Sequence, residues 1–223
     1  MALEHQEKIK CKDCSCEFDI TVYESVNGAF DVQAEEKLLK GELFTHICPN
    51  CGNVTALSYP MLYHNMDHRF MIHICPAEDD VQECIGNIKS AQKQIDEQFP
   101  EKRMEKPYTF RIVSDENALR EKAAIFSHGL DDRIIELLKL FFNSTFRMQN
   151  PSSASVVDML FFVGKNGEYA FQIFLEDDTY LVSDIPKHFY TLFKEKYTSA
   201  CDLLSHGNYV VDGNFAIAVM NVK

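Results

Sequence analysis

Two pairs of cysteines constrain the fold of this chain more than any other feature. The pairs are Cys11-Lys-Asp-Cys14 and Cys48-Pro-Asn-Cys51, each with two residues between the cysteines. This spacing allows one tight turn to direct both sulfur atoms toward the same point, and two such turns together supply four sulfurs in a tetrahedron. Since a structural Zn²⁺ takes that set of ligands, the pattern predicts an N-terminal region that folds around one ion.

The second pair carries the stronger signal of the two. Pro49 fixes φ on entry to the turn, and Gly52 can adopt the positive φ that the turn needs on leaving. The first pair has neither residue. The intervening segment, residues 15–47, is longer than the usual ribbon spacing. Loop length has a shallow entropic cost, so we expect both turns to share one site.

The predicted ligands are Cys11, Cys14, Cys48 and Cys51. Four thiolates leave no open coordination position, which indicates a structural rather than a catalytic ion. Zinc is the first expectation, and iron in a rubredoxin-like site, which uses the same turns, is the alternative. Cys16 is a candidate replacement ligand, but its side chain should point away if Cys14 binds. The competing interpretation is that these cysteines are ordinary thiols or disulfides.

Composition and charge restrict the classes of function. The chain has 223 residues and a formal net charge of −12, which suggests one large domain or two small ones and disfavours nucleic acid as a partner. The sequence contains no run of about 18 apolar residues, so no membrane span is expected. The first residues lack the apolar core of a signal peptide. Because the cysteine spacing is a metal pattern and a chain of this length needs no disulfides, we expect a reducing cytoplasm.

The N-terminal module is expected to span residues 1–76, and a connecting helix or linker residues 77–107. In the module, alternation and cap signals predict short strands and one helix, which Asp31 caps and Gly41 ends. In the linker, a helix precedes Pro100 and Pro107. The predicted strands and lead segments are 17–23, 43–47, 54–59 and 69–74, and the helices are 32–40 and 81–99.

Residues 108–223 are predicted to form an α+β domain with an antiparallel β-meander. Gly164-Lys-Asn-Gly167 is a hairpin signal, a helix begins near Pro186, and Asp212-Gly-Asn214 is predicted as a second hairpin turn. The expected strands are 108–113, 156–163, 168–176, 180–182, 209–211 and 215–219, with two helices between 115 and 142. The fold class is therefore α+β, with a zinc-ribbon or rubredoxin-like β module before this domain.

The chain resembles the CpXC family of bacterial and archaeal proteins, which is named for a Cys-Pro-x-Cys motif. The resemblance rests on Cys48-Pro-Asn-Cys51 and on residues 39–44, 59–64 and 70–72, and it continues more loosely to about residue 140. It implies a bacterial protein with a metal-binding cysteine quartet, and it supplies no activity. The family's ligands carry over to Cys11, Cys14, Cys48 and Cys51. Lys12 stands where the family often has proline.

Three weaker patterns in the sequence each have a simpler structural interpretation. His64 and His68, near His73, could bind a second metal if they lay on a helix, but the segment is predicted as a loop, which favours surface or turn histidines. Asp131-Asp132-Arg133 could hold a substrate, but acidic residues also begin helices, and capping is the favoured interpretation. The remaining cysteines are expected to be small buried side chains rather than nucleophiles. They are Cys75, Cys84 and Cys201.

The leading hypothesis is a zinc-binding, non-enzymatic interaction module in the bacterial cytoplasm, with a protein as its partner. One alternative is an enzyme whose site lies in the C-terminal domain, with zinc only structural. Another is a thiol-based redox sensor that releases zinc on oxidation. A ribbon that binds nucleic acid is disfavoured by the acidic charge. No catalytic residue is predicted.

Overall fold

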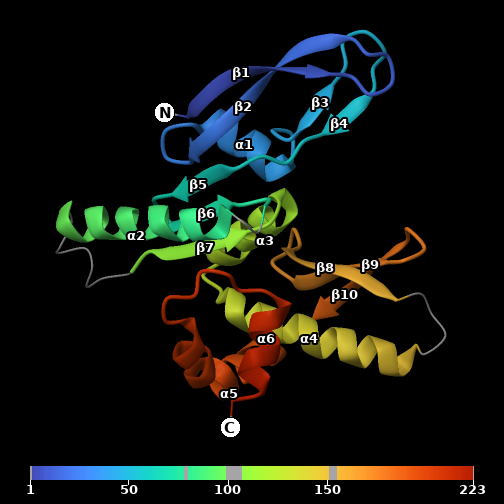
Figure 1. The fold of residues 1–223 in the computed structure, drawn as a ribbon. Helices are drawn as coiled ribbons and strands as arrows, with labels where there is room; N and C mark the ends of the chain where they lie inside the picture. Colours follow the sequence, from blue (N-terminus) through green and yellow to red (C-terminus); the bar gives the residue numbers. More distant parts are fainter. Residues whose placement is uncertain (1, 78–79, 99–106, 151–154, 223) are drawn as a thin grey trace. The chain divides into compact units, whose positions relative to one another are not determined.

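The structure is a computed structural model that describes residues 2–77, 80–98, 107–150 and 155–222. Within these ranges the chain is an α+β protein with six helices and ten strands (Figure 1). It divides into two compact units, Met1–Arg120 and Glu121–Lys223. None of the six helices combines the length and apolar character that crossing a lipid bilayer requires.

A five-stranded mixed sheet organises the first unit. Its order is β1-β2-β5-β6-β7, in which β2 and β5, and also β6 and β7, are parallel. Two helices and the two-stranded sheet β3-β4 complete the unit. The strands are β1 (Leu3–Lys10), β2 (Glu17–Asn27), β3 (Thr45–Ile47), β4 (Val54–Ala56), β5 (Met61–Asn65), β6 (Phe70–Ile74) and β7 (Thr109–Val113), and the helices are α1 (Val32–Lys40) and α2 (Val81–Gln98).

The first two strands form a ribbon that extends from the sheet (Figure 1). Strand β2 pairs with β5 only through residues 25–27, whereas its residues 17–23 pair with β1 alone. Ile20 and Val22 on β2 are buried, but β1 is exposed along nearly its whole length. Because a two-stranded ribbon is marginally stable by itself in water, this one depends on what closes its tip.

The apolar core of the first unit lies on the inner strands. Every residue of β6 except His73 is buried, which is typical of a strand covered on both faces. Tyr63 on β5 packs edge-to-face on Phe70, with ring centroids 5.4 Å apart. Ile88 of α2 is also buried. This part of the unit therefore has a core of its own, away from the ribbon tip.

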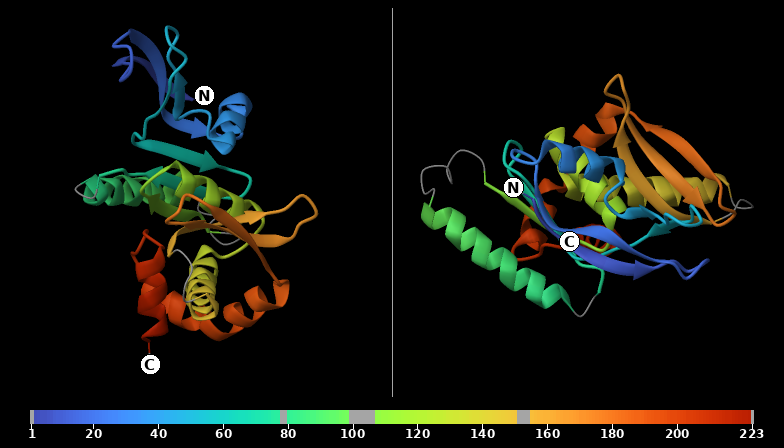
Figure 2. Two further views of the ribbon diagram at one scale, coloured as in Figure 1. Left: turned by 90° about the vertical axis from the view of Figure 1, so that its right-hand side faces the viewer. Right: turned by 90° about the horizontal axis from the view of Figure 1, so that it is seen from above.

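The second unit combines an antiparallel meander with helices. The three-stranded sheet has the order β10-β9-β8, and Figure 2 shows that it is curved. Helix α4 packs against α5, α6 and β8, while α3 crosses the division between the units. The elements are α3 (Glu116–Ser127), α4 (Asp132–Gln149), β8 (Val156–Val163), β9 (Tyr169–Leu175), β10 (Tyr180–Ile185), α5 (Lys187–Ser205) and α6 (Gly213–Met220).

The predicted meander is confirmed, but the second predicted hairpin is wrong. Residues 213–220 form helix α6 in place of a strand. The Asp212 carboxylate accepts the N–H of Phe215 at 2.9 Å, so it is the cap of a helix and not part of a turn. A short apolar run such as residues 215–219 fits a strand or a buried helix equally well by periodicity, and the cap decides here.

Strands β1 and β5 were not expected, and the predicted loop around His64 is in fact β5. The division of the chain also differs from the predicted boundaries at 76 and 107. Strand β7 pairs in parallel with β6, which places it in the sheet of the first unit, and the division follows Arg120. A parallel pairing across a helical crossover leaves no local turn signal in the sequence.

Candidate metal centre

The structure brings the four predicted ligands together at the tips of two hairpins. Cys11 follows β1 and Cys14 lies in the turn before β2, while Cys48 follows β3 and Cys51 lies in the turn before β4. The four Sγ atoms all lie within 4.8 Å of one another. The Sγ–Sγ distances across the two turns are 3.6 Å for Cys11–Cys51 and 3.6 Å for Cys14–Cys48.

The spacing of the sulfur atoms fits one tetrahedral ion. A zinc–sulfur bond of about 2.3 Å gives an edge of about 3.8 Å between sulfurs in a tetrahedron. The two shortest edges here, at 3.6 Å, are close to that length. Four thiolates are soft ligands of the kind that Zn²⁺ and iron take in closed sites. The residues therefore fit a structural metal, whereas the choice between zinc and iron depends on chemistry beyond geometry.

The two turns share one backbone conformation. The N–H of Ser15 donates to Cys11 O at 3.0 Å, and the N–H of Gly52 donates to Cys48 O at 2.9 Å. Both donors have positive φ, 59° at Ser15 and 74° at Gly52. The first turn thus reaches the same geometry as the second without proline or glycine, although the left-handed region is costly for a residue with a side chain.

The thiols of the cluster differ in acidity. Hydrogen bonds, first from the Asn50 side chain and then from the Cys16 backbone, lower the pKa of Cys14 to about 6. A hydrogen bond from the Asn53 backbone lowers the pKa of Cys51. The hydrogen bond shared with the Cys14 thiol, burial and the hydrogen bonds shared with the other two thiols outweigh it and raise that pKa to about 12. Neighbouring thiolates repel one another, so a bound dication would be needed to hold all four deprotonated.

Cys16 lies outside the cluster of four. Its Sγ donates to Glu17 O at 3.5 Å, and burial raises the pKa of its thiol. The neighbouring Cys48 and Cys14 thiols act on the pKa in the same direction, so Cys16 lies near the cluster without being one of its four members.

The structure gives no support to a second metal site at His64 and His68. Among the described residues, the four cysteines are the sole group of three or more side chains that could hold a metal. His64 lies on β5, where Nε2 and the Tyr108 hydroxyl are 3.1 Å apart and Nδ1 and Asn27 Nδ2 are 3.3 Å apart. Burial lowers the pKa of His64, which favours a neutral, hydrogen-bonded side chain.

A polar network beside His64 was not visible in the sequence. The Tyr63 hydroxyl donates to Glu35 Oε1 at 2.5 Å, and the Asn65 amide donates to the same oxygen at 3.1 Å. An added Cβ at Gly28 would lie 2.1 Å from that oxygen, so a side chain there would displace the Glu35 carboxylate from the network. The network joins α1 to β5. Its members are far apart in the chain, and no spacing rule connects them.

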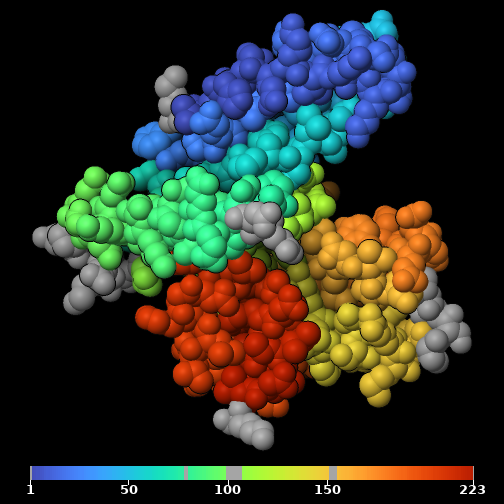
Figure 3. All heavy atoms as spheres, viewed as in Figure 1, coloured from blue at the N-terminus to red at the C-terminus, as the bar shows by residue number. Residues whose placement is uncertain are grey.

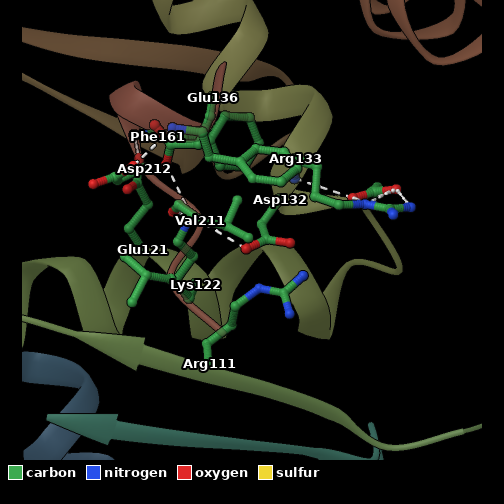
Figure 4. Close-up of polar contacts among 12 residues, drawn as sticks. Arg111, Glu121, Lys122, Asp132, Arg133, Glu136, Phe161, Val211 and Asp212 are labelled. Carbon is green, nitrogen blue, oxygen red and sulfur yellow. Dashed lines mark hydrogen bonds and ion pairs between the residues drawn. The ribbon is translucent and has the colours of Figure 1, made fainter. Parts of the chain in front are cut away.

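Residues 131–133 do not converge on one site. Asp131 caps α4 by accepting the N–H of Arg133 at 3.0 Å, which confirms the capping interpretation. The Arg133 guanidinium pairs with Asp131 at 2.7 Å and with Asp202 at 2.8 Å. Asp132 instead contacts Lys122 at 3.2 Å. Figure 4 shows Asp132 and Arg133 pointing in different directions.

Lys122 stands at the centre of a buried charged cluster in the second unit (Figure 4). Its side chain is 3% exposed, and its ammonium donates to Glu136 Oε1 and to Val211 O, each at 2.8 Å. Burial opposes the charge, but the carboxylates of Glu136 and Asp132 outweigh it and raise the pKa of Lys122. No motif marks such a cluster in a sequence. Its signal would be charged residues inside apolar helical stretches.

The three isolated cysteines have the character expected of buried side chains. Cys75 and Cys201 are buried and Cys84 is half-buried, and all eight cysteines of the chain are free thiols. Burial raises the pKa of Cys201 to about 11 and that of Cys84 to about 12. Thiols with raised pKa values are poor nucleophiles.

Comparison with known proteins gives one match. The sequence model of the CpXC family, described as CpXC protein, matches residues 9–139, which is more than half of the chain. The matched segment contains all four cysteines of the cluster. No curated protein and no solved structure matches the chain.

Proposed function

We propose a function for this chain, which belongs to the CpXC family: it is a zinc-stabilised module that binds a protein partner in the bacterial cytoplasm and is not an enzyme. The observation that carries the proposal is the clustering of four Sγ atoms within 4.8 Å on two matching turns. Four protein ligands complete a tetrahedral shell, so a substrate finds no open position on the ion.

The role of the ion is to join two hairpin tips in a zinc-ribbon-like arrangement. One tip closes the β1–β2 ribbon and the other closes the β3–β4 hairpin, and these belong to different sheets. In small metal-dependent domains the binding free energy, on the order of 10 kcal/mol, is folding free energy. Zinc would therefore hold a ribbon that is marginal without it.

The partner surface we propose is the outer edge of β1. This strand is the first in the sheet, so one of its edges lies open, and Leu3 on it is 57% exposed. Figure 3 shows this part of the chain at the molecular surface. Open backbone N–H and C=O groups accept an extended segment of another protein as an added strand. With a net charge of −12, the chain favours a protein over nucleic acid.

Elemental analysis of purified, tag-free protein tests the metal. We expect one zinc per chain, with the four cluster thiols protected from titration until a chelator is added, and with buried Cys75 and Cys201 slow to react in either case. Bound iron would change the identity of the ion but not the role proposed for it. A native protein without any transition metal and with the four cluster thiols reactive would contradict the proposal.

A photo-crosslinker at Gln6 on β1 tests the partner surface. We expect a defined protein adduct whose crosslinked segment is extended, and we expect Cys51→Ser, which removes a proposed ligand, to abolish it. The matched control carries the crosslinker at Lys165, in the turn between β8 and β9. The same adducts from both positions, or robust turnover on a broad substrate panel, would contradict a binding module.

The exposure of Cys51 favours one second candidate, a redox sensor. Peroxide would oxidise two cluster thiolates to a disulfide, itself being reduced to water, and zinc would leave. Reversible zinc release under mild peroxide is the expected result. Retention of zinc under that treatment would remove this candidate and would leave the binding module unaffected.

A further inference from the structure

Strand β10 leaves one edge of the second unit's sheet open. Within the described residues it pairs with β9 alone, so its other side has no neighbouring strand. The side chains of Tyr180, Leu181 and Val182 are 60%, 45% and 56% exposed. Because successive side chains point to opposite faces of a strand, apolar surface is exposed on both faces of β10. An edge of this kind is a template for pairing with another chain.

Proteins usually protect an open sheet edge, and β10 lacks the common devices. The strand contains no lysine or proline, and its pairing with β9 has no register shift. At the opposite edge of the same sheet, β8 has a register shift between Val156 and Asp158. Bulges, lysine and proline are features that keep edges from pairing. Of these two edges, β10 is therefore the one that can accept another strand along its whole length.

The turn between β9 and β10 shows which backbone groups of β10 are open. The N–H of Leu175 donates to Thr179 O at 2.9 Å. In an antiparallel pair, alternate residues direct their N–H and C=O groups toward the partner strand. Counting from Thr179, the odd-numbered residues of β10 face β9, and the even-numbered residues direct these groups outward. The outward-facing residues are Tyr180, Val182 and Asp184.

The three outward-facing residues are complementary to themselves. If a second β10 runs antiparallel with Val182 opposite Val182, then Tyr180 lies opposite Asp184 on each side of this centre. Every outward N–H and C=O group then meets a partner, with two hydrogen bonds for each pair. A shift by one residue would place outward groups against groups that already face β9. A shift by two would leave an end residue unpaired, so the central register is the favoured one.

The charges at the two ends of β10 favour the same antiparallel arrangement. Lys187 directly follows the strand and is exposed. Antiparallel pairing brings this lysine of each copy to the acidic end of the other, in line with Asp177, whereas parallel pairing would bring like charges together. The Asp184 carboxylate also faces Tyr180 and not a second carboxylate. The exposed acidic residues before the strand are Glu176, Asp177 and Asp178.

We propose that the chain forms a symmetric dimer in which the β10 strands of two copies pair antiparallel about Val182. The two three-stranded sheets become one continuous sheet, and the same surface of each copy forms the interface. Cross-strand contacts then cover the apolar side chains at the start of β10. Every residue of the interface belongs to the second unit, so the dimer is independent of the metal centre and of the partner surface on β1.

Sedimentation equilibrium of the full-length, zinc-loaded protein tests the proposal. We expect the parent to change from monomer to dimer as its concentration rises. Val182→Pro removes an outward N–H but no hydrogen bond to β9, and proline is tolerated on the open side of an edge strand. This variant should stay folded by circular dichroism and should dimerise at least about tenfold more weakly. Val182→Thr keeps the N–H and should dimerise like the parent.

A charge reversal tests the orientation of the two strands. Lys187→Glu should weaken dimerisation about fivefold, which is the effect of two exposed ion pairs in each dimer. Lys196→Glu makes the same change of charge further along α5 and is the matched control. General repulsion between acidic chains would weaken dimerisation equally in both variants, and that result would contradict the proposed orientation.

Disulfide trapping tests the register and does not depend on the proline variant. Paired Cα atoms about 5.5 Å apart are within disulfide range. Oxidised glutathione should therefore link two copies of Val182→Cys, while the oxidant itself is reduced to two molecules of glutathione. Tyr180→Cys would lie roughly 13 Å from its own counterpart, so it should give no more linked dimer than the parent, whose eight cysteines set the background.

Three results would overturn the proposal. The first is a parent that stays monomeric at millimolar concentration, including one that binds an unrelated protein along β10. The second is a folded Val182→Pro protein that dimerises as tightly as the parent, because the copies would then associate through another surface. The third is equal crosslinking of Val182→Cys and Tyr180→Cys, which would mean that contact between copies has no fixed register.

Discussion

Ser15 carries the backbone strain of the metal centre. It occupies the position that Gly52 holds in the second turn, and both residues have positive φ. A residue with a Cβ loses about 1–2 kcal/mol in the left-handed region. The hydrogen bond from Ser15 N–H to Cys11 O shows that the turn forms nevertheless. Such strain persists where the surrounding structure requires it, here four sulfurs that must meet.

The first prediction concerns these two positions. Gly52→Ala should lower the free energy of unfolding by about 1 kcal/mol and should speed zinc loss, because alanine disfavours positive φ. An added Cβ there meets nothing within 4 Å beyond its chain neighbours, so the cost comes from the local backbone conformation alone. Ser15→Gly should have the opposite effect. Urea denaturation and transfer of zinc to a chelator measure both quantities.

Gly86→Ala is the matched control for this prediction. Gly86 lies inside helix α2, where an added Cβ also meets nothing within 4 Å. The same substitution should therefore stabilise the protein, by about 0.5–1 kcal/mol. A loss of stability at Gly86 equal to that at Gly52 would show that the conformational argument fails.

The second prediction concerns the pH dependence of stability through His64. Burial lowers its pKa below the ordinary value of 6.5, so the unfolded chain binds a proton that the folded chain resists. The free energy of unfolding should therefore fall as pH falls below 6.5, until the folded pKa is reached. His64→Gln should lose less stability than the parent between pH 7.5 and 5.5. Acid removes zinc from both proteins alike, so that effect cancels in the comparison. Equal losses of unfolding free energy in the two proteins, measured from denaturation curves, would refute the assignment of this pH dependence to His64.

At the scale of elements, the ribbon and the inner strands should respond differently to loss of the metal. Cys51→Ser removes one of the proposed ligands. The sequence alone predicts that residues 9–76 unfold and that the later domain stays folded. The structure narrows this expectation, because β5 and β6 belong to a buried core that includes β7. We therefore expect loss of hydrogen-exchange protection in β1–β4, with protection retained in β5–β7.

Hydrogen exchange followed by mass spectrometry measures this third prediction. Cys84→Ser, a cysteine substitution outside the cluster, should leave the protection of β1–β4 unchanged. Uniform loss of protection across the first unit in Cys51→Ser would mean that the ribbon and the inner strands form one cooperative element.

Elements with local start and stop signals could be predicted from the sequence. Helix α1 was expected at residues 32–40 and has these bounds, and Gly41 ends it with a φ of 78°. Strands β8 and β9 form the expected hairpin, with Gly164-Lys-Asn-Gly167 in the turn between them. Strand β1 could not be predicted in this way, because an exposed edge strand shows polar residues on both faces. Helix α6 was missed because a turn and a helix cap use the same residue types.

The same distinction between local signals and tertiary packing applies to the residues of the candidate site. The cysteine positions follow from spacing alone, and the structure brings all four together. The contacts around Glu35 and Lys122 depend on tertiary packing between distant segments. Residue types that pair in a folded core are common elsewhere in the chain, so only the fold identifies the partners.

At the scale of the whole molecule, the fourth prediction tests the buried charged cluster of the second unit. Lys122→Met removes a buried ammonium group that contacts the carboxylates of Glu136 and Asp132. Removing one side of a buried ion pair costs about 3–5 kcal/mol, so the denaturation midpoint of the second unit should fall. Lys165→Met, on an exposed turn, should change stability by less than about 0.5 kcal/mol. Equal, small changes in both variants would mean that the cluster contributes little.

The Lys122→Met variant also shows whether the two units unfold together or separately. The chain divides after Arg120, and the cysteines and Lys122 lie on different sides of that division. Hydrogen exchange on Lys122→Met should therefore show its largest change within Glu121–Lys223, as Cys51→Ser should within Met1–Arg120. Identical protection maps for the two variants would indicate one cooperative molecule.

The enclosure of Lys122 also has a consequence for covalent chemistry. An amine surrounded by two carboxylates and a carbonyl, with 3% of its side chain exposed, is protonated and out of reach of acylating reagents. Exposed lysines of the same unit, such as Lys165 and Lys187, would be acylated rapidly, whereas Lys122 would react only in molecules that have opened. The rate at which Lys122 is acylated therefore measures how often the second unit opens under native conditions.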